Sequence, residues 1–131
     1  MAPISANLAD KILNQVFSTG HATFSGNTTG VWVQLHTGDP GKTCTANALA
    51  SCPRFIVPFG TAGSATIANN ATASVVSSAT GTVTHISTWD SSDTASGNAL
   101  FYGAITNKQI GNVGDTVTLA VGALTIAVST S

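Results

Sequence analysis

Residues 31–41 carry the sequence VWVQLHTGDPG, in which an alternating run of side chains leads into a tight polar turn. From Val31 to Leu35 every second residue is aliphatic, so a β-strand would place these side chains on one face and Trp32 and Gln34 on the other. The run ends in HTGDPG, where glycine and proline favour a turn and the aspartate can bond its backbone. This stretch predicts a strand of a sheet followed by a sharp exit.

Similar short runs continue to the C-terminus, separated by Gly, Asn, Asp and Pro. We expect strands over residues 54–57, 64–68, 73–76, 82–89, 99–105, 117–121 and 124–128. Asn69-Asn70 is a plausible turn of a hairpin that pairs 64–68 with 73–76. The aliphatic side chains change from odd to even positions at Gly122-Ala123, which predicts a bulge or a turn there. The fold class expected is mainly β, a small antiparallel β-sandwich or flattened barrel, because no crossover helices are visible.

The N-terminal residues 5–17 (SANLADKILNQVF) form the predicted helix. Leu8, Ile12 and Val16 recur at every fourth position and give one apolar stripe. Ser5 can cap the start of the helix. The stripe packs either on the sheet of its own chain or on another subunit, so Leu8, Ile12 and Val16 are candidate interface residues.

The length of 131 residues is typical of a single domain. We expect a helix arm over residues 1–20 and a single β-sandwich domain over residues 21–131. The alternation of side chains predicts that the core of this domain contains Val31, Val33, Leu35, Val117, Leu119, Leu124, Ile126 and Val128.

Charge is scarce in this sequence. Nine residues are charged, 7% of the chain against about 25% in ordinary soluble domains, and the formal net charge is −1. Such a chain has no field that would attract a polynucleotide, so nucleic acid is excluded as a partner. No stretch approaches the roughly 18 apolar residues of a membrane span. Polarity comes instead from 20 Thr and 14 Ser, which favours an extracellular or particle-bound β protein.

The two cysteines, Cys44 and Cys52, lie in a connection rich in Gly and Pro between two strands. The seven residues between them allow an intrachain disulfide that would close a short loop. Two free thiols are the alternative. The spacing is too wide for a redox CxxC pair, and no second pair is present for a metal site.

Residues that could carry chemistry are few. His21, His36 and His85 could join Asp39 or Asp90 in a zinc site, but no HxH or HxxxH spacing brings two of them together. The sequence has no Gly-x-Ser-x-Gly motif and no discernible pair of carboxylates tuned for acid and base roles. We therefore expect no metal, no cofactor and no enzymatic activity.

The aromatic residues Trp32, Trp89, Phe101 and Tyr102 are the largest anchors available for a core or an interface. Both tryptophans fall in strand patterns, which favours core packing. Trp89 is also a candidate interface residue, and an exposed tryptophan could form a platform for a glycan.

Several of these segments together resemble small structural proteins of tailed phages, especially those that infect actinobacteria. The likeness rests on VWVQLHTGDPG at 31–41, HISTWD at 85–90, LFYGAI at 100–105, VGDTV at 113–117 and the opening helix LADKILNQVF. It covers nearly the whole chain, although the Cys44–Cys52 loop departs from it. The resemblance implies a virion subunit with a β-sandwich, no cofactor and self-association.

From composition and resemblance together we expect a capsid decoration protein on the outside of the capsid. Its partners would be the major capsid protein and copies of itself, as a trimer or dimer. A minor tail, tail tip or fibre subunit is the first alternative, with the tail as its location. A carbohydrate-binding β-sandwich module is the second.

Overall fold

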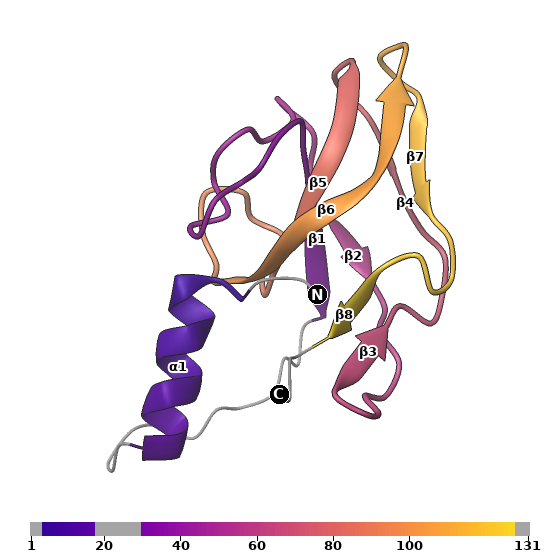
Figure 1. The fold of residues 1–131 in the computed structure, drawn as a ribbon. Helices are drawn as coiled ribbons and strands as arrows, with labels where there is room; N and C mark the ends of the chain where they lie inside the picture. The colour runs from indigo at the N-terminus through magenta and orange to yellow at the C-terminus, as the bar shows by residue number, and fades with distance from the viewer. Residues whose placement is uncertain (1–3, 18–29, 128–131) are drawn as a thin grey trace.

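The computed structural model describes residues 4–17 and 30–127, which form one helix and eight strands (Figure 1). In chain order they are α1 Ala6–Phe17, β1 Val31–His36, β2 Phe55–Val57, β3 Thr66–Ala68, β4 Ala73–Val76, β5 Gly81–Trp89, β6 Ala99–Ile110, β7 Thr116–Leu119 and β8 Thr125–Ala127. All strand pairs are antiparallel. The expected class, mainly β with one N-terminal helix, is confirmed, and the described strands do not close into a barrel.

The first layer is a four-stranded sheet in the order β2-β1-β5-β6. Because side chains alternate along β1, Val33 and Leu35 lie on one face of this sheet and Trp32, Gln34 and His36 on the other. We call the first the core face and the second the polar face. The connection over residues 90–98 lies on the polar face, where Arg54 bonds both it and Gln34 of β1. The connection over residues 37–54 runs beside the end of β1 through the bridge of His36 with Ala48; its Cys44 packs with Trp89, whereas its Leu49 and Cys52 pack in the core.

The second layer consists of two short antiparallel pairs, β3 with β8 and β4 with β7. The predicted hairpin of 64–68 with 73–76 is therefore wrong. Asn69 is buried and does not turn the chain back on itself. Its amide donates to the carbonyls of Ala71 and Ala120, and its Oδ1 accepts from the backbone N–H of Leu124 at 2.9 Å. These bonds join the β3–β4 connection to the β7–β8 connection.

The chain turns at Gly122, where the aliphatic side chains change from odd to even positions. The N–H of Ala123 bonds the carbonyl of Ala120 at 3.0 Å, and Gly122 adopts a φ of +76°, which favours glycine. Leu119 and Leu124 consequently face the same core although one is odd-numbered and the other even-numbered. The sequence predicted either a bulge or a turn at this position, and the structure shows a turn.

The core lies between the two layers. Six of the expected core residues are buried: Val33, Leu35, Val117, Leu119, Leu124 and Ile126. Val31 is only half-buried at the start of β1, and Val128 lies outside the described residues. The pattern thus identified both layers of the core correctly, although it paired the strands of the second layer wrongly.

Helix α1 is attached to the start of β6. The N–H of Ser5 donates to the carbonyl of Leu100 at 2.8 Å, and the Ser5 hydroxyl donates to the carbonyl of Ala99 at 2.5 Å. The same hydroxyl accepts from the N–H of Leu8 at 3.2 Å, so Ser5 caps the helix as expected. Among the described residues no helix is long and apolar enough to cross a membrane. The expected domain boundary at residue 20 lies outside the described ranges.

Candidate functional site

Among the described side chains of helix α1, only those of the first turn pack on the sheet. Leu8 is 5% exposed, whereas Ile12 is 43%, Leu13 53% and Phe17 79% exposed. Figure 1 shows the helix extending away from the strands beyond this attachment. The side chain of Val16 lies outside the described part. Of the candidate interface residues on the helix, Leu8 therefore belongs to the chain's own packing, while Ile12 is available to a partner.

Trp89 is not an exposed interface residue. It is 6% exposed at the end of β5, and the Arg54 guanidinium lies over its ring at 3.7 Å from the centroid. Its Nε1–H donates to the Ser87 hydroxyl at 2.8 Å. The Arg54 side chain and the residues around it cover both the ring and its polar edge, so Trp89 is also no platform for a glycan.

His36 continues the hydrogen-bond chain that begins at Trp89. Its Nε2 lies 2.7 Å from the Ser87 hydroxyl, and its Nδ1 lies 2.8 Å from the carbonyl of Ala46. A carbonyl can only accept, so Nδ1 carries the proton and Nε2 of the neutral ring accepts from Ser87. Burial lowers the pKa of His36, the nearby charges of His85 and Arg54 lower it further, and the bond to Ala46 opposes them. The neutral ring is the form that this network requires.

Arg54 holds the connection over residues 90–98 against the sheet. Its Nη1 donates to the carbonyls of Ser91, Asp93 and Ser96 at 3.2, 2.5 and 2.9 Å. Its Nε donates to Oε1 of Gln34 at 3.2 Å. Burial lowers the pKa of Arg54, while Asp93 and Asp90 act in the opposite direction. Sequence reasoning missed this role, because the only signal was a single cation at the start of a strand.

The expected disulfide is not formed in the structure. Cys44 and Cys52 are both buried free thiols. Cys44 packs with Trp89 and Ala99, whereas Cys52 packs in the main core. Burial raises the pKa of the Cys44 thiol to about 11 and also raises that of Cys52. The structure thus matches the free-thiol alternative.

The histidines do not form a metal site in the described ranges. His36 and His85 are paired positions on β1 and β5, a proximity that their sequence separation concealed. No group of three or more His, Cys, Asp or Glu side chains gathers there to hold a metal ion. Asp90 instead accepts from the backbone and side-chain amides of Asn98 at 2.6 and 2.7 Å. His21 lies outside the described residues.

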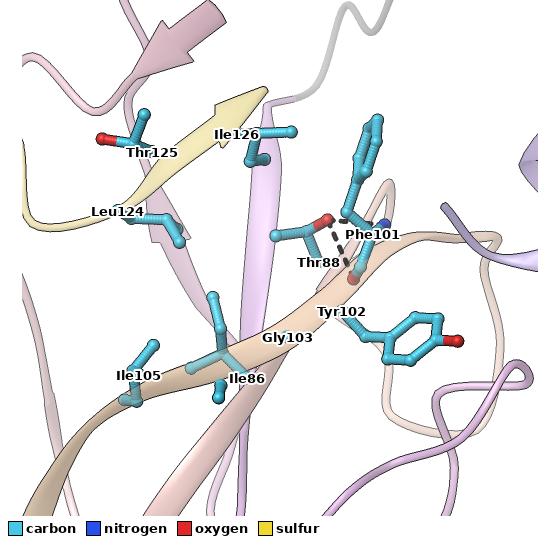
Figure 2. Close-up of a pocket in the computed structure, with 10 residues that line it drawn as sticks. Ile86, Thr88, Phe101, Tyr102, Gly103, Ile105, Leu124, Thr125 and Ile126 are labelled. Carbon is cyan, nitrogen blue, oxygen red and sulfur yellow. Dashed lines mark hydrogen bonds between the residues drawn. The ribbon is translucent and has the colours of Figure 1, made fainter. Parts of the chain in front are cut away.

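A small pocket of about 130 Å³ lies where β8 crosses β5 and β6 (Figure 2). Leu124 and Ile126 line it from the second layer, and Ile86 and Ile105 line it from the first. Figure 2 also shows Thr88 bonded to the backbone of Phe101 at its edge. Among the described residues that line it, Tyr102 alone is ionisable. The described residues that line the pocket offer no paired acid and base.

Comparison with known proteins adds one finding to this geometry. Residues 3–127 match the profile of the family described as "Podophage GP4 fiber I protein gp80". A search of the curated proteins finds no match. The matched range contains α1, both layers of the sandwich and the connections over residues 37–54 and 90–98.

Proposed function

Because this chain belongs to the podophage fibre protein family, we propose that it is a subunit of a phage tail fibre. As a member of this family, the chain is a phage virion structural protein. The fibre assignment is supported by the description of the family, which matches nearly the full length. In this proposal the chain acts by assembly and has no catalytic role.

The tail alternative thereby replaces capsid decoration as the favoured function. The expectation of a capsid protein rested on the resemblance to phage proteins together with the scarcity of charge and the abundance of Thr and Ser. These features of composition fit any site where identical neighbours cover the surface. They describe how a subunit packs, and they carry no information about which part of the particle contains it. The family description favours the fibre.

Assembly with copies of the same chain is proposed to use the free part of α1. Ile12, Leu13 and Phe17 form an exposed apolar group on a helix whose first turn is already fixed to β6. A helix attached at one end can present this group to a neighbour without unfolding the sandwich. A homo-oligomer, a trimer or dimer, would remove these side chains from water.

The test is the position and copy number of the chain in purified particles. Antibody fragments against the folded domain should label tail fibres in electron micrographs. Quantitative mass spectrometry should give few copies of the chain per copy of the major capsid protein. Labelling over the whole head, with copy numbers near that of the capsid protein, would contradict the fibre assignment.

A further inference from the structure

A cleft of about 530 Å³ opens on the polar face of the four-stranded sheet. Residues 48–53 form one wall, residues 92–94 form the other, and Gln34 of β1 lies between them. The connections that supply the walls are far apart in sequence. Figure 1 shows them at the same side of the sheet, away from the second layer.

Both walls are fixed by hydrogen bonds from side chains outside them, two of which, Arg54 and His36, are buried. Arg54 bonds three carbonyls of the 90–98 connection, including that of Asp93 at 2.5 Å. His36 bonds the carbonyl of Ala46, just before the other wall, and the Ser78 hydroxyl bonds the carbonyl of Ser51. Ser51 itself adopts a φ of +56°. The two walls are therefore held in one arrangement without a ligand, and such preorganisation lowers the cost of binding.

The cleft presents polar groups that the fold leaves available. Oε1 of Gln34 accepts from Arg54, and no hydrogen bond within the described structure engages Nε2 of Gln34 or the hydroxyls of Ser92 and Thr94. The carboxylate of Asp93 accepts from Ala95 and Ser96 at 2.8 and 2.9 Å. Each of its oxygens retains a further lone pair.

These groups indicate the chemistry of the ligand. The cleft combines an amide donor, a carboxylate acceptor and two hydroxyls with the apolar surface of Pro53. The charge of Asp93 is opposed by Arg54 behind it, so the cleft has no excess charge to select an ion. Its volume lies in the range of small-molecule sites. We propose that this cleft binds an uncharged saccharide, independently of where on the virion the chain lies.

The first experiment titrates the purified protein with neutral sugars: glucose, galactose, mannose, N-acetylglucosamine, maltose and lactose. At least one sugar should shift the NMR signals of the Gln34 side-chain amide and of the backbone at residues 92–94. We expect a dissociation constant on the order of 1 mM, as for a ligand held by a few hydrogen bonds. Absence of shifts with all six sugars at tens of millimolar would overturn the proposal.

The second experiment uses matched variants. The double variant Ser92→Ala/Thr94→Ala removes two hydroxyls that make no bond in the fold, and it should weaken binding about tenfold. Ser74→Ala/Thr118→Ala removes the same two groups from the exposed face of β4 and β7 and should leave binding unchanged. Thr94→Trp should block the cleft in a folded protein. Equal losses in both double variants, or full binding by Thr94→Trp, would place the sugar elsewhere and contradict the proposal.

Discussion

His36 is a fully buried histidine whose neutral form satisfies the hydrogen bonds of Ser87 and Ala46. Its pKa lies below the ordinary value of 6.5, so below pH 6.5 the unfolded chain binds more protons than the folded one. Stability should therefore fall as the pH decreases from 7.5 to about 5, by at most about 1.4 kcal/mol per pH unit. Urea denaturation at each pH measures this loss. The variant His36→Gln should be less stable at pH 7.5, and its free energy of unfolding should depend less on pH. An unchanged pH dependence in this variant would show that another group causes the loss of stability.

The thiols of Cys44 and Cys52 provide a second prediction. Both are buried, and the pKa of Cys44 is raised to about 11, so thiolate is scarce at either site. Native protein purified without reductant should react slowly with Ellman's reagent at pH 8, and the same protein in urea should react rapidly at both sites. Peptide mass spectrometry identifies the modified residues. Unreactive cysteines in the unfolded, unreduced chain would show that the disulfide forms after all.

The alternation of side chains along a strand predicted correctly, for most of the expected core positions, which individual residues are buried. Val33 and Leu35 are buried because every second residue of β1 faces the core, which is visible in the sequence. The same rule placed Trp32 and Gln34 on the opposite face. It could not show that Arg54 would cover Trp89, because that contact depends on how the 90–98 connection folds over the sheet.

At the level of elements, Asn69 joins the two connections of the second layer. Its side-chain amide and its backbone make hydrogen bonds to residues 120–124. Because the site is buried, water does not readily replace these bonds. Asn69→Ala should lower the free energy of unfolding by roughly 2–4 kcal/mol, since a buried N–H and carbonyls lose their partners. Chemical denaturation measures the change.

The neighbouring Asn70 supplies the control for this prediction. It is exposed, and its described bond to Pro58 uses the backbone N–H, which alanine retains. Asn70→Ala should therefore change stability by less than about 0.5 kcal/mol. If the two variants lose similar stability, Asn69 does not hold the second layer together, and the pairing of β3 with β8 and of β4 with β7 needs revision.

The sequence predicted which segments are strands but not all of their partners. Each run has its own local signal, including the turn residues that end it. Pairing depends on side chains that meet across the fold, and here Asn69 bonds residues about fifty positions later. Asn-Asn is a common turn, so the local signal favoured a hairpin that the buried amide prevents. The candidate site was less predictable still, because the cleft is formed by two connections that meet only after folding.

For the whole molecule, the exposed apolar group on α1 predicts assembly through the helix. The triple variant Ile12→Ser/Leu13→Ser/Phe17→Ser should leave the sandwich folded, because Ser5 and Leu8 still attach the helix. It should shift the protein from oligomer to monomer in analytical ultracentrifugation, since three large apolar side chains drive the contact. The control Val76→Ser/Val113→Ser/Val121→Ser removes three side chains of similar exposure elsewhere and should keep the oligomer.

The salt dependence of this assembly separates an apolar contact from an electrostatic one. The exposed group on α1 carries no charge, and the chain has nine charged residues in all. Raising the ionic strength from about 0.1 to 1 M shortens the Debye length from roughly 10 to 3 Å and screens exposed ion pairs. An oligomer held by α1 should therefore persist in 1 M salt. Dissociation of the unmodified protein under these conditions, or an oligomer that survives the triple substitution in α1, would mean that copies associate through another surface.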